Sequence, residues 1–165
     1  MTKPGLAPRR AALWLVGQVT GGGRLMSDLL PGAVERLEPA DRARAQRLAM
    51  QTLRWMDRAD RMLGPHLKKR PPLDVHNILR LAVVATCVEG EAPHAVVDTA
   101  VSLARSARGT ARFAGLVNAV LRNVVRTSAS WRNLPLPRLP KWLRKPLLAA
   151  YGKAAVEAIE AAHAA

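Results

Sequence analysis

One segment, Ile78-Leu79-Arg80-Leu81-Ala82-Val83-Val84-Ala85, is apolar on almost every side when it is wound as a helix. A helix of this kind belongs at the centre of a bundle, where other helices cover all of its faces. Asp74 offers an N-cap, and we expect the helix to run from Val75 to Val88 before Gly90 ends it. The segment therefore predicts an all-helical fold built around one buried helix.

Helical periodicity recurs on both sides of this segment, whereas strand patterns are nearly absent. We expect further helices at about residues 8–20, 24–38, 39–63, 93–107 and 110–126, separated by turns that contain glycine or proline. The last of these is the clearest, since its apolar residues repeat at helical spacing without a gap: Phe113, Leu116, Val117, Val120, Leu121 and Val124. The fold class is thus all-α, a compact bundle of about six to seven helices over residues 1–130.

The sequence changes character beyond this bundle. Residues 131–141 contain three prolines, a composition typical of an extended linker. The stretch that follows suggests one or two short helices, interrupted at Pro146, and it ends in alanine-rich turns without a stop signal. We expect Trp131 and Trp142 to anchor the linker against a neighbouring domain. Residues 131–165 are therefore interpreted as a Pro-rich linker and short C-terminal helices, the start of a truncated following segment.

The charge balance is the first functional indication. Lysine and arginine outnumber the acids 26 to 12, and the net charge is +14. From Thr99 to Val156 there are eleven basic residues and no acidic one. A field of this kind recruits polyanions, and nucleic acid is the usual one. The alternative is a basic surface that only confers solubility, but solubility does not require a segment without acids.

Three basic clusters are candidates for nucleic-acid contacts. One lies at the start of the first helix, one in the loop before the central helix, and one on the side of the last bundle helix that points away from its apolar stripe. The residues are Arg9 and Arg10; Lys68, Lys69 and Arg70; and Arg122 and Arg126. Exposed arginines are common on helices, so each residue taken alone is also compatible with a solvated surface. The sequence does not indicate which clusters share one surface.

Catalytic and metal-binding patterns are not found in the sequence. The four histidines lack metal-ligand spacing, and the single cysteine, Cys87, lies in an apolar run typical of a buried thiol. Gly21-Gly22-Gly23 follows a helix rather than a strand, so we interpret it as a helix stop. No apolar run approaches the ~20 residues that span a membrane. We therefore expect no catalytic residue, metal or cofactor in this chain, and a cytoplasmic location.

Several segments, taken in order, resemble the NusB fold, particularly as it occurs at the N-terminus of RsmB-type ribosomal RNA cytosine-5 methyltransferases (the RsmB/NOP family). They are Pro8–Leu13, Asp41–Leu48 with Leu53-Arg54, Ile78–Ala82, Ala92–Val101 and Leu116-Val117-Asn118-Ala119-Val120-Leu121-Arg122. The stretch Leu139–Leu143 with Tyr151-Gly152 resembles the segment that joins the NusB-like domain to the methyltransferase part. Asp98-Thr99 departs from the family pattern, which often has an Asn-Glu pair there.

The resemblance implies an RNA-binding domain that positions 16S ribosomal RNA for a methyltransferase whose catalytic half, with its S-adenosylmethionine site, is absent from this chain. A transcription antitermination factor that binds RNA together with a ribosomal protein is the first alternative. A protein-interaction module is the second. We expect a monomer or weak homodimer. Asn118 is expected to hydrogen-bond a neighbouring loop and hold the helices together rather than to contact RNA.

Overall fold

The computed structural model describes residues 3–165, and in this part of the chain it contains seven α-helices and three short 3-10 turns. The helices are α1 (Leu6–Gly22), α2 (Met26–Val34), α3 (Pro39–Leu63), α4 (Leu73–Cys87), α5 (Pro93–Arg105), α6 (Ala114–Arg126) and α7 (Lys141–Ala164). This confirms the predicted all-α bundle. None of the described helices is both long enough and apolar enough to cross a membrane.

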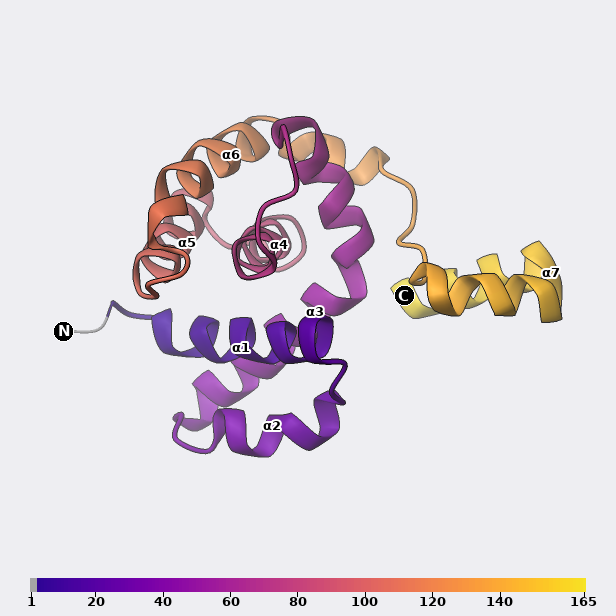
Figure 1. Cartoon of the computed structure of the whole chain (residues 1–165), viewed down its shortest axis with the longest axis horizontal. Helices are drawn as coiled ribbons and strands as arrows, with labels where there is room; N and C mark the ends of the chain where they lie inside the picture. The colour runs from indigo at the N-terminus through magenta and orange to yellow at the C-terminus, as the bar shows by residue number, and fades with distance from the viewer. Residues whose placement is uncertain (1–2) are drawn as a thin grey trace.

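Helix α4 lies at the centre of the bundle, as its sequence predicts. Every residue from Val75 to Ala85 is buried. Helices α1, α3, α5 and α6 contact α4 and surround it, and Figure 1 shows it end-on inside this ring. Because α4 is covered on all sides, its apolar residues can contribute to one continuous core with the stripes of the four surrounding helices.

A polar cluster links α3 to α4 at the edge of this core, where the Asp60 side chain is 35% exposed. Arg80 of α4 is 4% exposed and donates two hydrogen bonds of 2.7 Å to the carboxylate of Asp60 in α3. His76 Nε2 lies 2.9 Å from the same carboxylate. Burial alone would raise the pKa of Asp60, but the hydrogen bonds from Arg80 and His76 outweigh it and lower that pKa to about 2. Asp60 is therefore ionised and neutralises the buried guanidinium.

Two helix ends test the predicted stop and cap signals. Gly23 has a left-handed φ of 63° and donates its N–H to the carbonyl of Val19 at 3.2 Å, so the glycine run ends α1 as predicted. The predicted N-cap at Asp74 is wrong. Helix α4 begins at Leu73 after Pro72, and Asp74 lies in its first turn, where a carboxylate still favours the positive end of the helix.

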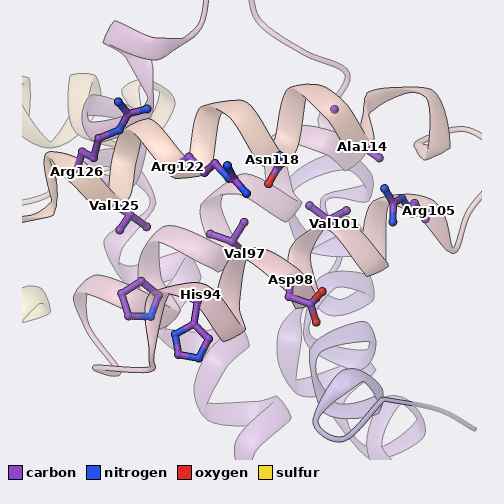
Figure 2. Close-up of a pocket in the computed structure, with 12 residues that line it drawn as sticks. His94, Val97, Asp98, Val101, Arg105, Ala114, Asn118, Arg122, Val125 and Arg126 are labelled. Carbon is purple, nitrogen blue, oxygen red and sulfur yellow. The ribbon is translucent and has the colours of Figure 1, made fainter.

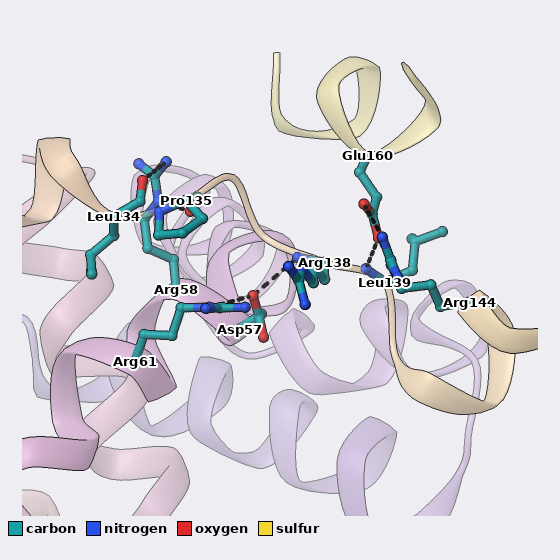
Figure 3. A network of polar contacts seen from close by, with 9 residues as sticks. All are labelled: Asp57, Arg58, Arg61, Leu134, Pro135, Arg138, Leu139, Arg144 and Glu160. Carbon is teal, nitrogen blue, oxygen red and sulfur yellow. Dashed lines mark hydrogen bonds and ion pairs between the residues drawn. The ribbon is translucent and has the colours of Figure 1, made fainter. Parts of the chain in front are cut away.

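The linker between the bundle and α7 follows a fixed path. Trp131 is buried in the core beside Trp55, with 6.0 Å between the ring centroids, as an anchoring role predicts. The guanidinium of Arg58 lies over both indole rings, at 5.0 and 5.3 Å, and donates hydrogen bonds to the carbonyls of Leu134 (2.8 Å) and Pro135 (2.9 Å). Figure 3 shows the hydrogen bonds from Arg58 to these two carbonyls and the polar contacts that follow along the linker.

Two expectations about the C-terminal region are wrong. Helix α7 runs through Pro146, and its break lies at Gly152, where φ is 79° and ψ is 170°. Pro146 removes only one N–H donor from the helix, whereas the torsions of Gly152 depart from helical values altogether. Trp142 does not anchor the linker, because the residue is 77% exposed.

Candidate nucleic-acid interface

An open groove of about 830 Å³ lies between α5 and α6. The two helices run antiparallel, so Arg105 faces the start of α6 while His94 faces its end (Figure 2). The groove combines an apolar floor with a basic rim. The floor includes Val97, Val101 and Val125. The rim carries Arg105, Arg122 and Arg126. Ligand sites commonly pair an apolar surface with a few convergent polar groups.

Helical spacing accounts for this arrangement. On α6, Val117, Val120, Leu121 and Val124 are buried against the core. Asn118, Arg122 and Val125 follow one another at intervals of four and three residues along the flank of that apolar stripe, so all three line the groove. The same interval on α5 brings Val97, Val101 and Arg105 to its facing side. Two adjacent amphipathic helices thus produce the groove.

The groove is positively charged. Among residues 3–165, Arg105 and Arg122 have no ion-pair or hydrogen-bond partner, while Arg126 donates a 2.7 Å hydrogen bond from Nη2 to Oδ1 of Asn123. Asp98 is the one acid that lines the groove in the described chain, and its carboxylate lies 2.9 Å from Nζ of Lys3. Three guanidinium groups are therefore available there to an anionic ligand.

The predicted cluster in the loop before α4 lies near one end of α6. Lys68, Lys69 and Arg70 are all exposed. His66, just before this loop, has Nε2 3.4 Å from Oγ1 of Thr127, the residue that follows α6. The loop therefore begins at the end of α6 that carries Arg126. Arg70 itself lines a separate hollow beside the linker.

The predicted pair on α1 divides between the interior and the surface. Arg9 is 7% exposed, pairs with Glu91 and donates a hydrogen bond of 2.9 Å to the carbonyl of Gly5. Burial lowers the pKa of Arg9, although Glu91 opposes this shift. Arg44 also contacts Glu91, at 3.0 Å. Because its guanidinium is engaged inside the fold, Arg9 is not presented to a ligand; Arg10 is exposed.

Replacing Arg9 with alanine is expected to lower the free energy of unfolding by about 2 kcal/mol. This loss is smaller than that expected for breaking a fully buried ion pair, because Arg44 still neutralises Glu91. The Arg10→Ala variant should unfold within about 0.5 kcal/mol of the unaltered chain, because Arg10 is exposed. Urea denaturation of both variants measures the difference. Equal stabilities would contradict a structural role for Arg9.

Two of the groove residues are not among the contacts proposed from the sequence, and a third was assigned a wrong role. Arg105 belongs to the acid-free segment, and its spacing from Val97 and Val101 on α5 was an available signal. His94 lies at the mouth of the groove (Figure 2). The expected role of Asn118 is wrong: within residues 3–165 its amide has no hydrogen-bond partner, and it lies in the groove instead of holding a loop.

Three other features bear on whether the chain could hold a reactive thiol, a metal or a cofactor. Burial raises the pKa of the Cys87 thiol to about 11, so the thiolate is scarce at neutral pH. No group of three potential metal ligands occurs in the part of the chain that the structure describes. In the glycine run, Gly21 approaches α4 closely, and an added Cβ there would lie 2.9 Å from Leu73 Cδ2.

Comparison with known proteins agrees with this architecture. The model of the NusB family matches residues 7–126, which span the bundle from α1 to the end of α6. The chain belongs to the NusB family. The match includes the whole of α5 and α6, so the basic groove is part of the NusB domain rather than an addition to it.

Among curated proteins, this NusB-family chain is similar to those named ribosomal RNA small subunit methyltransferase B. The Pseudomonas putida protein is 30% identical over an alignment of 152 positions, which covers 86% of this chain and 34% of that protein. The Xanthomonas campestris protein is 34% identical over an alignment of 159 positions, which covers 90% of this chain and 34% of that protein. The chain thus spans about a third of the length of these relatives, and the similarity extends beyond the NusB domain into α7.

Proposed function

We propose that this NusB-family domain binds small-subunit ribosomal RNA and positions it for a ribosomal RNA methyltransferase. The observation that carries the proposal is the groove between α5 and α6, where Arg105, Arg122 and Arg126 surround an apolar floor. Arginine neutralises phosphates, releases counterions and stacks on unpaired bases. The relatives named as small-subunit methyltransferases supply the class of RNA.

The linker supports a positioning role. Arg58 holds the carbonyls of Leu134 and Pro135, and further along the chain the N–H of Arg138 donates to Asp57 at 3.1 Å. Leu139 donates its N–H to Glu160 of α7 at 2.9 Å (Figure 3). A tether fixed by side chains at several points transmits the orientation of the RNA-binding bundle to whatever follows it.

Glu160 joins the two halves of α7 through the same network. Its carboxylate accepts a 2.7 Å hydrogen bond from Nε of Arg144. Burial would raise the pKa of Glu160, but the hydrogen bonds from Arg144 and Leu139 lower it. We therefore propose that residues 131–165 act as a rigid connector between the NusB domain, residues 1–130, and a catalytic part. The methyl donor, S-adenosylmethionine, would bind there.

Competitive binding distinguishes this function from the alternatives. The chain is titrated with 16S rRNA fragments and with a boxA-like antitermination RNA of equal length, across a salt series. Tighter binding of the 16S fragments is the expected result. Preference for the boxA-like RNA would identify an antitermination factor, with which a ribosomal protein partner would be consistent. Absence of salt-dependent binding to either RNA would leave a protein-interaction module and overturn the proposal.

A further inference from the structure

We infer that the α5–α6 groove takes an unpaired nucleotide of single-stranded RNA, with its base on the apolar floor and Asn118 reading the edge of that base. The inference rests on the proposed function and deepens it, because it names the form of RNA and a residue that sets specificity. It follows from the groove's shape, its charge and the Asn118 amide inside it, which has no hydrogen-bond partner among residues 3–165.

The groove matches the two chemical halves of a nucleotide. Its floor offers Val97, Val101 and Val125, all partly buried, to a flat and weakly polar surface. Its rim offers the guanidinium groups of Arg105 and Arg122 to phosphate. In a duplex the bases are stacked and paired, so a duplex would present phosphates to an apolar floor and lose contact with it. Unpaired bases can be splayed out into such a site.

The arginine spacing suits a strand that runs along α6. Arg122 and Arg126 are four residues apart, about one helical turn or ~6 Å along the axis. Successive phosphates of an extended strand can therefore meet successive arginines. The bond from Arg126 to Asn123 directs one guanidinium, while that of Arg122 remains free in the described chain to stack on a base or bind phosphate.

Asn118 provides the means of discrimination. Its side chain lies midway along the groove, between Arg122 and the start of α6, and it faces α5 (Figure 2). A free amide presents one acceptor and two donors, and these can pair with the edge of a base in one orientation only. Valine neighbours cannot compete for those hydrogen bonds. Asn118 should therefore favour some bases over others, whereas the arginines should bind every sequence.

The test uses fluorescence anisotropy with labelled eight-nucleotide RNAs: the four homopolymers and one mixed sequence, the latter single-stranded and as a duplex. The unaltered chain should bind the single strand about tenfold more tightly than the duplex. Arg105→Gln/Arg122→Gln should weaken binding to every single strand at least about tenfold and reduce the salt slope by roughly 1.4. The control, Arg24→Gln/Arg36→Gln, removes the same charge from exposed positions at the two ends of α2.

The Asn118→Ala variant separates base selectivity from electrostatic attraction to phosphate. It should reduce the spread of affinities among the four homopolymers while leaving the salt slope unchanged. Equal losses in the groove and control variants, or equal affinity for duplex and single strand, would overturn the groove assignment while RNA binding by the domain stood. Absence of binding to any RNA would instead overturn the proposed function itself.

Discussion

Asp60→Asn is expected to lower the free energy of unfolding by about 3 kcal/mol, because it leaves a buried guanidinium without its counter-charge. Arg80 is 4% exposed, and both of its hydrogen bonds to Asp60 measure 2.7 Å. The substitution keeps the shape of the side chain, so the loss reports the charge rather than a cavity. Urea denaturation followed by circular dichroism, extrapolated linearly to water, measures it.

A matched control for this charge effect is Asp98→Asn. Asp98 pairs with Lys3 at 2.9 Å, but both side chains are more than half exposed, 64% and 53%. Exposed pairs of this kind contribute about 0–1 kcal/mol. A loss at Asp60 no larger than the loss at Asp98 would show that the buried cluster does not stabilise the bundle through its charge.

The same cluster predicts a dependence on pH. The folded-state pKa of Asp60 is about 2, below its ordinary value of 3.8, so its ionised form favours folding. This contribution is fully present above about pH 4 and is lost as the pH falls toward 2. The stability difference between the unaltered chain and Asp60→Asn should therefore be constant above pH 4 and narrow below it. A difference that stays constant down to pH 2, measured by urea denaturation, would contradict the assignment.

Arg58→Ala is expected to cost about 3 kcal/mol and to free the linker. The substitution removes two charge-assisted hydrogen bonds to the carbonyls of Leu134 and Pro135, each contributing about 1.5 kcal/mol or more. It also removes the cation that lies over Trp55 and Trp131. Thermal unfolding measures the first effect. Trypsin cleavage after Arg138 measures the second, and it should become faster.

Two further variants serve as controls for the Arg58→Ala result. Arg58→Lys keeps the charge but cannot reproduce the two-pronged contact, so it should lie between the unaltered chain and the alanine variant. Arg54→Ala removes an arginine one turn earlier on α3 that makes no side-chain hydrogen bond within residues 3–165. It should alter neither stability nor cleavage appreciably. Unchanged cleavage in Arg58→Ala would show that Arg58 does not restrain the linker.

The sequence predicts the centre of the fold because burial leaves a strong pattern. The apolar run of α4 is compatible only with a buried helix, and the apolar stripe of α6 identifies the side of α6 that faces the core. Local signals at helix ends were weaker. Asp74 has a side chain typical of an N-cap, yet the helix starts at Leu73, two residues before the predicted start at Val75, because Pro72 already occupies the N-cap position.

The candidate site was less predictable, because it depends on which helices become neighbours. Arg9 and Arg122 look equally available in the sequence, but the partner of Arg9, Glu91, lies 82 residues away and only the fold brings it close. Arg105 becomes part of a candidate site only because residues of α6 face it across the groove, and no local sequence pattern reveals that these helices are neighbours. Which arginines are available to a ligand therefore depends on salt-bridge partners that only the folded structure brings together.

Photochemical crosslinking to 16S rRNA fragments, followed by mass spectrometry of the attached peptides, tests the central claim most directly. Binding in the groove predicts crosslinks within residues 93–126, the span of α5 and α6, and their loss in Arg105→Gln/Arg122→Gln. Crosslinks confined to α2 or α7, or crosslinks within residues 93–126 that persist in that variant, would contradict RNA recognition by this groove.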